Sequence, residues 1–256
     1  MSITIKTKEE IAILREGGRR LAEILRELKA AVRPGRTAAE LNLLAEKLVA
    51  EGGDKSAFLN YKPYGASRPY PASLCVSVND EIVHGIPNEQ EKILKEGDIV
   101  SLDMGLIHKN LFTDMAVTVP VGKVSPDALK LLEVTKEALK AGIDAARGGA
   151  RVGDISFAIE SFIKPHGYGI VEELAGHGVG YKVHEDPYVP NYGKKNSGPV
   201  LKPGTVLAIE PMVNEGTKAT ILSPDGYTYR TADGKRSAHF EKTIVITEGE
   251  PEVLTQ

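Results

Sequence analysis

The apolar residues of the chain form two strand-like runs, separated by a short polar break, over residues 99–119. Val, Ile, Leu and Thr dominate residues 99–107 and 111–119, and His108-Lys109-Asn110 lies between them. This pattern predicts a β-hairpin with its turn near Lys109. Each strand carries one carboxylate, Asp103 or Asp114. We expect the two to lie nearly opposite each other, with Cβ atoms roughly 4.5–5.5 Å apart.

Helical spacing and capping residues predict four helices. Residues 7–32 have apolar side chains every three or four positions, and Arg33-Pro34-Gly35 ends the pattern. Gly17-Gly18 lowers the helix propensity there, which predicts a kink or two shorter helices. Thr37 and Glu40 form a capping box for a helix that stops at Gly52-Gly53. Two further helices are predicted at about 125–147, after Ser125-Pro126, and at about 154–164.

The remaining segments are predicted as short strands and loops. Strands are expected at 74–78 and 81–83, ending at His84, and at 169–173, 206–210, 212–221, 227–231 and 241–246. Residues 60–73 contain several tyrosines and prolines. Proline stiffens a loop and tyrosine gives it flat, amphipathic surface, so this loop is expected to be a pocket wall, with packing against the body of the protein as the alternative.

The same order of features occurs twice. Residues 95–103 resemble 202–210, which pairs Asp103 with Glu210, and 112–119 resemble 239–246, which pairs Asp114 with Glu241. Residues 33–50 align with 147–164, and the sequence around His84 matches that around His184. We therefore predict one domain, 1–256, built from two diverged halves at about 7–123 and 124–256. A pseudo-twofold axis between them would bring the acids and histidines to one centre.

Composition limits the function classes. An apolar content of 41% and a charged content of 26% fit a soluble globular protein, and a net charge of −3 argues against general nucleic-acid binding. Cys75 is the single cysteine, so no intrachain disulfide can form. The N-terminus lacks an apolar signal core, and no apolar run is long enough to span a membrane. We expect a cytoplasmic protein with no membrane partner.

The paired acids indicate a metal site. Two carboxylates held together in an apolar sheet repel each other and lose hydration, so a cation is expected between them; two solvated acids on an exposed hairpin are the alternative. Four carboxylates and the imidazole of His177 would balance two divalent cations. Taken alone, His177 fits a buried, hydrogen-bonded histidine better than a metal ligand. Oxygen-rich ligation with one imidazole suits Mn, Fe or Co and tolerates Zn, and two such ions can activate a water for hydrolysis.

These motifs resemble a known family. Five motifs are similar to those of the methionine aminopeptidases. They are the spacing of eleven between Asp103 and Asp114, Gly176-His177-Gly178-Val179-Gly180, His184-Glu185-x-Pro187, Ile209-Glu210-Pro211-Met212-Val213 and Glu241-x-Thr243. The resemblance covers nearly the whole chain. It implies the α+β pita-bread fold, with an antiparallel sheet covered by helices. The short interval between Glu210 and Glu241 and the lack of a zinc-binding extension resemble the type I, short bacterial form.

The resemblance implies a role for each site residue. Asp103 chelates one metal, His177 and Glu210 hold the other, and Asp114 and Glu241 bridge both. A bridging hydroxide attacks the first peptide carbonyl while Glu210 handles its proton. His184 polarises that carbonyl, and His84 assists at the scissile nitrogen. The substrate's free amine binds a metal, which restricts cleavage to the first residue. Tyr70 and Cys75 match positions that line the methionine pocket, and Tyr227 stands where bacterial relatives often have Trp.

Three features depart from the family pattern. His239 occupies a position that is usually Gln, Lys242 one that is usually His, and the Tyr/Pro loop before Cys75 is longer than in the common short enzyme. These departures concern the pocket rather than the metal ligands. Cys75 is expected to be a wall or small core residue rather than a nucleophile, because no base is paired with it. His108 and His166 have no evident partner and are expected at the surface.

Two other functions remain open at this point. A proline-specific aminopeptidase or dipeptidase shares the fold and all five ligands, but usually has a large extra N-terminal domain and Glu-Pro-Gly where this chain has Glu210-Pro211-Met212. A pita-bread binding protein without catalysis usually has an eroded ligand set, which this chain does not. For the aminopeptidase we expect nascent polypeptide N-termini as partners, transient association with the ribosome, no specific nucleic acid, and a monomer.

Overall fold

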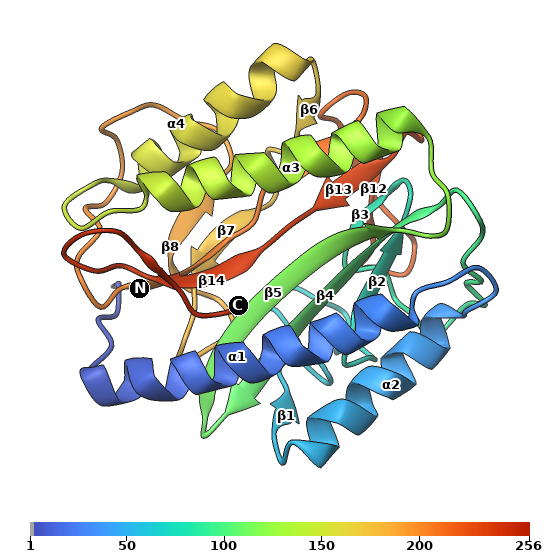
Figure 1. Cartoon of the computed structure of the whole chain (residues 1–256), viewed down its shortest axis with the longest axis horizontal. Helices are drawn as coiled ribbons and strands as arrows, with labels where there is room; N and C mark the ends of the chain where they lie inside the picture. Colours follow the sequence, from blue (N-terminus) through green and yellow to red (C-terminus); the bar gives the residue numbers. More distant parts are fainter. Residues whose placement is uncertain (1–2) are drawn as a thin grey trace.

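The computed structural model describes residues 3–256, which form four long helices packed on one side of a set of antiparallel sheets (Figure 1). The helices are α1 (Lys8–Ala31), α2 (Ala38–Glu51), α3 (Pro126–Ala145) and α4 (Val152–Ile163), and the 3-10 turn η1 spans Lys164–His166. The strands of the first half are β1 (Lys55–Ser56), β2 (Cys75–Val78), β3 (Glu81–Val83), β4 (Ile99–His108) and β5 (Leu111–Pro120). Those of the second half are β6 (Gly169–Ile170), β7 (Ala175–Gly178), β8 (Glu185–Pro190), β9 (Val206–Ile209), β10 (Met212–Asn214), β11 (Thr220–Leu222), β12 (Tyr229–Thr231), β13 (Ser237–His239), β14 (Lys242–Val245) and β15 (Glu252–Val253).

Local sequence signals account for the helix ends. Thr7 and Thr37 cap α1 and α2 through capping boxes, in which the side chain of the residue three positions later bonds back to the cap. The Ser125 hydroxyl accepts from the Ala128 N–H at the start of α3, and Pro126 is the first residue of that helix. The four predicted helices are therefore confirmed, with ends that differ from the prediction by a few residues.

The prediction of a kink at Gly17-Gly18 is wrong, because α1 is one helix from Lys8 to Ala31. Both glycines are buried and serve close packing. A Cβ on Gly18 would lie 2.3 Å from the backbone oxygen of Leu254, and one on Gly17 would lie 3.0 Å from the Cβ of His108. The missing side chains let α1 approach the hairpin and the C-terminal segment, which offsets the lower helix propensity.

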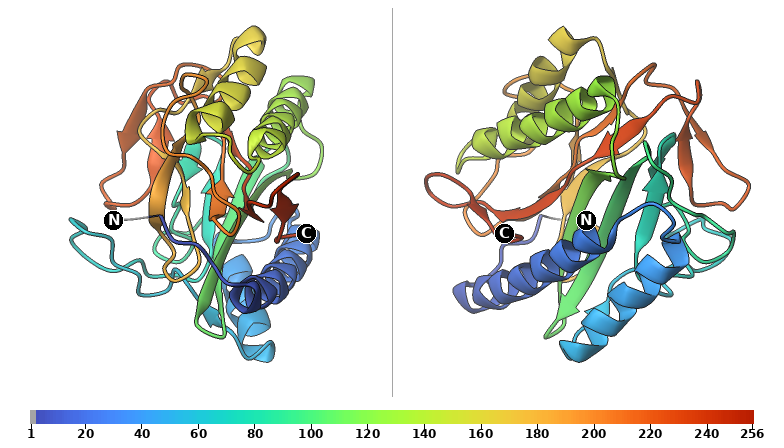
Figure 2. Two further views of the ribbon diagram at one scale, coloured as in Figure 1. Left: turned by 90° about the vertical axis from the view of Figure 1, so that its left-hand side faces the viewer. Right: turned by 45° about the vertical axis from the view of Figure 1, so that its right-hand side comes forward.

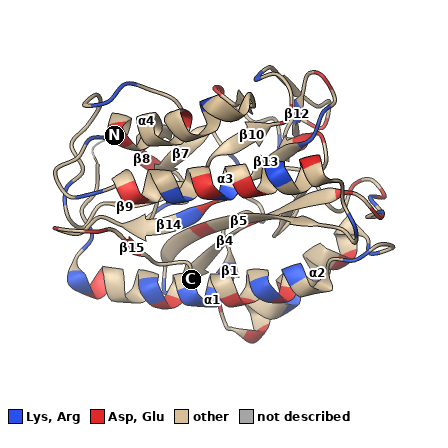
Figure 3. Cartoon of the chain, turned by 45° about the horizontal axis from the view of Figure 1, so that its top comes forward, with Lys and Arg blue, Asp and Glu red and all other residues tan. Residues whose placement is uncertain are grey.

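The two halves repeat the same layering. One core lies where α1 and α2 pack on β2 and β4, and it includes Leu21, Leu25, Leu41, Leu102 and Met104. A second core lies where α3 and α4 pack on the strands of the second half. All four helices lie on one side of the sheets, as Figure 2 shows. In Figure 3 the basic and acidic residues alternate along α1 and α3, as expected for solvated helix faces.

Strand pairing follows the predicted repeat. β4 pairs antiparallel with β5 in the first half, and β9 pairs antiparallel with β14 in the second. The sheet orders are β1-β4-β2, with β5 on β4, and β15-β14-β9-β7-β8; two three-stranded sheets have the orders β13-β10-β6 and β11-β12-β3. The predicted strand at 212–221 is in fact two separate strands, β10 and β11.

The halves are joined along β5. The backbone N–H of Glu241 donates to the oxygen of Ala116 (2.9 Å). The Thr243 hydroxyl donates to the backbone oxygen of Asp114 (2.7 Å) and accepts from the backbone N–H of Asp114 (2.9 Å). The Thr118 hydroxyl bonds in the same way to the backbone of His239. These contacts fix the acids of one half against the acids of the other, because Asp114 and Glu241 are part of the joined segments.

Candidate metal centre

Asp103 and Asp114 lie on the same face of the hairpin but are not directly opposite. Asp103 pairs with Ala116, and Asp114 pairs with Gly105, so the two acids are diagonal neighbours. The reason is the turn. Lys109 and Asn110 both have positive φ, 47° and 66°, which is typical of a two-residue type I′ turn. In the register that this turn gives, the residue opposite Asp103 is two positions beyond Asp114, and side chains two positions apart on a strand share a face.

Glu210 and Glu241 lie where the chain passes from one strand to the next. Glu210 falls between β9 and β10, and Glu241 falls between β13 and β14. The equivalent acids of the first half instead lie within the long, continuous strands β4 and β5. The acids that the repeat pairs therefore differ in local backbone between the two halves.

His177 comes from β7, where glycines on both sides allow close approach of neighbouring strands. A Cβ on Gly176 would lie 2.4 Å from the Ala208 oxygen, and one on Gly178 would lie 2.2 Å from the Asp186 oxygen. The Nδ1 of His177 lies 2.9 Å from the oxygen of Gly178. Because a carbonyl can only accept, Nδ1 carries the hydrogen, and Nε2 keeps the lone pair that a metal needs.

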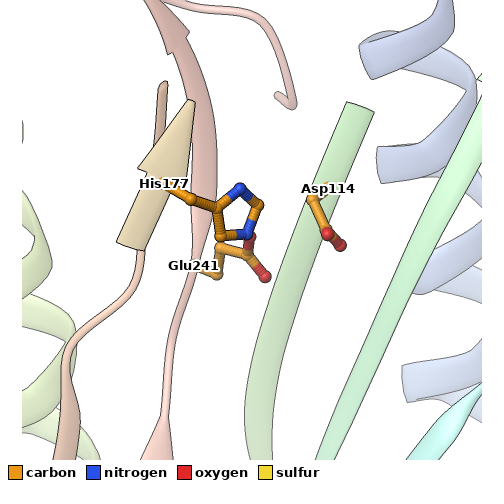
Figure 4. Close-up of side chains that lie close together, drawn as sticks. All are labelled: Asp114, His177 and Glu241. Carbon is orange, nitrogen blue, oxygen red and sulfur yellow. The ribbon is translucent and has the colours of Figure 1, made fainter. Parts of the chain in front are cut away.

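The side chains converge on a common point. One donor atom each from Asp114, His177 and Glu241 lie within 4.8 Å of one another, and all three residues are buried (Figure 4). The Nε2 of His177 is 3.3 Å from Oε1 of Glu210. Asp103 is also buried, and its Oδ1, like Oε1 of Glu241, has no hydrogen-bond partner among residues 3–256. All five predicted ligands line one cavity and are thus brought together.

The electrostatics of this cluster favour a bound cation. Burial raises the pKa of Asp103 to about 7 and the pKa values of Asp114, Glu210 and Glu241 well above their ordinary range, and mutual repulsion adds to the shift at Asp103, Asp114 and Glu241. Burial lowers the pKa of His177 to about 3, which keeps its imidazole neutral. The cluster combines acids that cannot all ionise together, unpaired carboxylate oxygens and a neutral imidazole. This combination is the donor set of a divalent-metal site.

Metal removal should therefore make stability depend on pH. Asp103 ordinarily titrates near 3.8 but near 7 in the fold, so between these pH values the unfolded chain has released a proton that the metal-free fold retains. Rising pH then favours unfolding of the metal-free protein. Bound cations remove this penalty, and they bind more tightly as the ligands ionise. We expect the gap in Tm between metal-loaded and chelator-treated protein to widen by at least about 5 °C from pH 5 to pH 7.5. Parallel curves of Tm against pH would contradict this.

The cluster opens into a cavity of about 390 Å³. Tyr70, Cys75 and Tyr227, predicted as pocket residues, all line it, as do His84 and His184. The Tyr70 hydroxyl donates to the Gly85 oxygen (3.0 Å), and its ring meets the ring of Tyr227 edge-on at 5.2 Å. Burial raises the pKa of the Cys75 thiol well above its ordinary value, as expected for a wall residue rather than a nucleophile.

His84 has an unusual backbone. It follows β3 with φ of 58°, in the left-handed region that non-glycine residues rarely adopt. Its side chain lines both the 390 Å³ cavity and an adjoining cavity of about 410 Å³ that also contacts His177, His184 and Glu210. Burial lowers the pKa of His84 to about 4, so the imidazole is neutral at neutral pH. Backbone strain of this kind is often concentrated at functional positions.

The loop at residues 60–73 forms one wall of the cavity, so the pocket-wall prediction is confirmed. Tyr61, Pro63, Tyr64 and Tyr70 of this loop all line the cavity. Sequence reasoning did not single out Tyr61, whose hydroxyl lies 2.9 Å from Nδ1 of His184. The density of tyrosine and proline in the loop was the available signal, but it does not say which tyrosine reaches the histidine.

A buried ion pair next to His184 was also missed. The ammonium of Lys6 lies 2.7 Å from Oε2 of Glu185, with 0% and 7% of the two side chains exposed. Thr4 donates to the same oxygen, and the Lys182 N–H donates to the other one. The pair therefore ties the N-terminal segment to the chain that carries His184. A separation of 179 residues gave no sequence signal for it.

Lys6→Met should destabilise the protein strongly. The substitution leaves the Glu185 carboxylate buried without its cation, a change that typically costs about 3–5 kcal/mol. Lys8→Met is the matched control, because Lys8 is exposed on the first turn of α1 and its replacement should change stability by less than about 0.5 kcal/mol. Urea unfolding of the metal-loaded proteins measures both. Equal stabilities for the two variants would show that the pair contributes nothing.

The prediction that His108 is a surface residue is wrong. His108 is buried at the end of β4, and its Nδ1 lies 2.7 Å from Oδ1 of Asp54. Its burial follows from the close approach of α1 at Gly17. His166 is exposed, as predicted.

His239 and Lys242, the two single-residue departures from the family pattern, lie on opposite sides of Glu241 in the sequence. His239 is buried, with Nε2 3.4 Å from Oε2 of Glu210, and it is absent from the residues that line the 390 Å³ cavity. Lys242 instead reaches away to the C-terminal segment, where its ammonium donates to the Thr255 oxygen. Burial lowers the pKa of Lys242 to about 8.

Comparison with known proteins decides the family. A family model described as metallopeptidase family M24 matches residues 12–248, which include every predicted ligand. The chain belongs to metallopeptidase family M24. As an M24 metallopeptidase it is a peptide hydrolase that works with bound metal, in agreement with the acidic cluster described above.

Among M24 proteins the chain is most readily compared with methionine aminopeptidases. It is 46% identical over 254 residues to methionine aminopeptidase 1 of Bacillus subtilis, with 99% of each chain covered. The crystal structure of a methionine aminopeptidase from Thermotoga maritima matches with a TM-score of 0.94 and 42% identity over the whole of both chains. A prolidase from Pyrococcus furiosus shares the fold with a TM-score of 0.76 at 24% identity, covering 98% of this chain and 65% of the prolidase. The predicted pita-bread fold is confirmed.

Proposed function

We propose that this M24 metallopeptidase removes the N-terminal methionine from polypeptides whose second residue is small. The observation that carries the proposal is a buried cluster of four carboxylates and His177 on the wall of a cavity lined by Tyr70, Cys75 and Tyr227. The cluster supplies a metal-dependent hydrolytic centre, and the aromatic wall suits one apolar side chain. The similarity to methionine aminopeptidases over the whole chain supports the same activity.

Asp103, Asp114, His177, Glu210 and Glu241 would hold two divalent cations, of which Co, Mn, Fe and Zn fit the donor set. Such cations, when bound, lower the pKa of a water and clamp the reacting oxygens. In this proposal Asp114 and Glu241 would be shared by both cations, as the family resemblance implies, and their donor atoms lie together with that of His177. The surrounding chain holds these donor atoms in fixed positions and shields them from bulk water.

The remaining steps are assigned to neutral and acidic side chains around the cluster. Glu210 accepts the proton of the attacking water and returns it to the departing amine. His184 donates a hydrogen bond to the carbonyl oxygen of the first peptide bond. His84, neutral and facing both cavities, assists at the scissile nitrogen.

The alternative within the family is cleavage next to proline. Initial rates on a Met-Ala peptide and on an Xaa-Pro peptide of equal length distinguish the two. We expect cleavage of the Met-Ala peptide to be faster by at least about 100-fold, the upper range of discrimination by an apolar pocket. Faster cleavage of the Xaa-Pro peptide would overturn the proposal. A metal titration that finds no bound divalent cation would instead favour a binding protein without catalysis.

The proposed substrates are the N-termini of nascent polypeptides, and we extend the proposal to a cytoplasmic monomer that associates transiently with the ribosome. Within residues 3–256, no helix is both long and apolar enough to cross a membrane. The net charge of −3 gives no support to a specific nucleic-acid partner.

A further inference from the structure

The ring of His184 is held from two sides. On one side it meets the ring of His177 edge-on, with centroids 4.5 Å apart. On the other side its Nδ1 lies 2.9 Å from the hydroxyl of Tyr61, whose ring meets it edge-on at 5.4 Å. Tyr61 and His184 are 123 residues apart and come from opposite halves of the chain. This contact therefore exists only because the fold brings the Tyr/Pro loop over the centre.

Tyr61 lies at the fixed base of its loop rather than at the tip. Its backbone N–H donates to the backbone oxygen of Phe58 (2.9 Å), and its backbone oxygen accepts from the backbone N–H of Tyr70 (2.8 Å). The Asn60 N–H donates to the Tyr70 oxygen (2.9 Å), which closes a short ladder across the loop. By contrast, Tyr64 is fully exposed at the tip. The Tyr61 hydroxyl is thus presented to His184 by a constrained backbone, which reduces the entropy lost in forming the contact.

The direction of this hydrogen bond decides what His184 can do. A neutral imidazole has one N–H and one lone pair, so its two nitrogens always play opposite roles. If the phenol donates to Nδ1, the hydrogen of His184 is on Nε2, which can then donate to a carbonyl oxygen. If Nδ1 donates to the phenol, Nε2 carries a lone pair and cannot donate. Burial raises the pKa of Tyr61, which keeps the phenol protonated and able to donate at neutral pH.

We propose that Tyr61 is a positioning residue that donates to Nδ1 of His184 and so holds its hydrogen on Nε2, facing the substrate carbonyl. This inference rests on the role proposed above for His184 and deepens it. The imidazole is pre-organised before substrate binds, and the loop at residues 60–73 acts on catalysis as well as forming the pocket wall. The hydroxyl itself, rather than the aromatic ring, supplies this effect.

Tyr61→Phe tests the proposal, because it removes the hydroxyl and keeps the ring. We expect kcat on a Met-Ala peptide to fall on the order of 10-fold, which is the scale of one hydrogen bond, with KM and bound metal unchanged. Tyr192→Phe is the matched control, since it removes a hydroxyl from an exposed tyrosine that lines neither cavity, and it should leave kcat unchanged. An unchanged kcat in Tyr61→Phe, or a raised KM alone, would reduce Tyr61 to a wall residue.

A double-mutant cycle separates this role from a direct contact with substrate. In a His184→Ala background, Tyr61→Phe should cause no further loss of kcat, because the group it positions is gone. An equal additional loss there would overturn the proposal. Nitrogen-15 NMR of the zinc-loaded protein reads the tautomer directly: we expect the hydrogen of His184 on Nε2 in the parent protein and a mixture of tautomers in Tyr61→Phe. A hydrogen on Nδ1 in the parent protein would also overturn it. This readout needs no turnover, so it distinguishes failure of the inference from failure of the proposed function.

Discussion

Asp114→Asn and Glu241→Gln are each expected to abolish turnover of a Met-Ala peptide and to lower bound metal below two ions per chain. Both residues are buried, and their donor atoms lie together with that of His177. Each substitution keeps the shape of the side chain but removes one negative charge from between the proposed cations. The loss in kcat should exceed the roughly 10²–10³-fold that removal of a single stabilising contact to a transition state causes, because the metals themselves are affected.

Exposed acids provide matched controls for these two variants. Asp144→Asn and Glu133→Gln make the same chemical changes on the solvent side of α3, and neither should alter kcat or metal content.

The thermal stability of the metal-free variants provides a second test. The metal-free forms of Asp114→Asn and Glu241→Gln should unfold at a higher temperature than the metal-free parent, since each removes one member of a repelling group. Full activity with two bound ions in either variant would show that the residue does not bridge.

His84→Ala should lower kcat by about 10²–10⁴-fold, the range typical of a positioned acid–base group, while both metals remain bound. The side chain lines both adjoining cavities, and it is not needed to complete the proposed donor set. Metal content by elemental analysis and kcat on a Met-Ala peptide measure the two effects separately. Loss of metal in this variant would place His84 among the ligands instead.

The backbone of His84 requires a second variant. Because φ at this residue is 58°, Ala could change the local conformation as well as remove the imidazole. Asn adopts this region more readily than other non-glycine residues, so His84→Asn keeps the backbone while removing the ring. We expect both variants to lose activity to a similar extent. A much smaller loss in His84→Asn would mean that the backbone conformation, rather than the imidazole, matters.

Much of the fold followed from local signals. The capping boxes at Thr7 and Thr37 marked helix starts because the side chain and backbone that bond there lie only three residues apart. The hairpin at Asp103 and Asp114 was evident because strand composition and turn residues are also local. The repeat then carried the prediction from this hairpin to Glu210 and Glu241, whose spacing in sequence gives no hint of their proximity. The boundaries of the proposed single domain and its two halves stay a prediction.

What the sequence could not reveal depends on contacts between distant segments. The register of the hairpin was set by φ values at Lys109 and Asn110 that residue types alone did not determine. His108 was wrongly predicted at the surface because its partner, Asp54, lies 54 residues earlier in the chain, after α2. The kink at Gly17 and Gly18 was predicted from helix propensity alone. In the structure these glycines pack against the hairpin and the C-terminal segment, which the sequence around them does not show. The Tyr61–His184 and Lys6–Glu185 contacts were missed for the same reason.

Anomalous diffraction from crystals grown with Mn²⁺ tests the central claim most directly. The account predicts two strong peaks per chain about 3.5–4 Å apart, both within bonding distance of Asp114 and Glu241, with His177 on one of the two ions. A map with no peak among these side chains, or with its ions bound elsewhere, would contradict the assignment of the cluster as the metal centre.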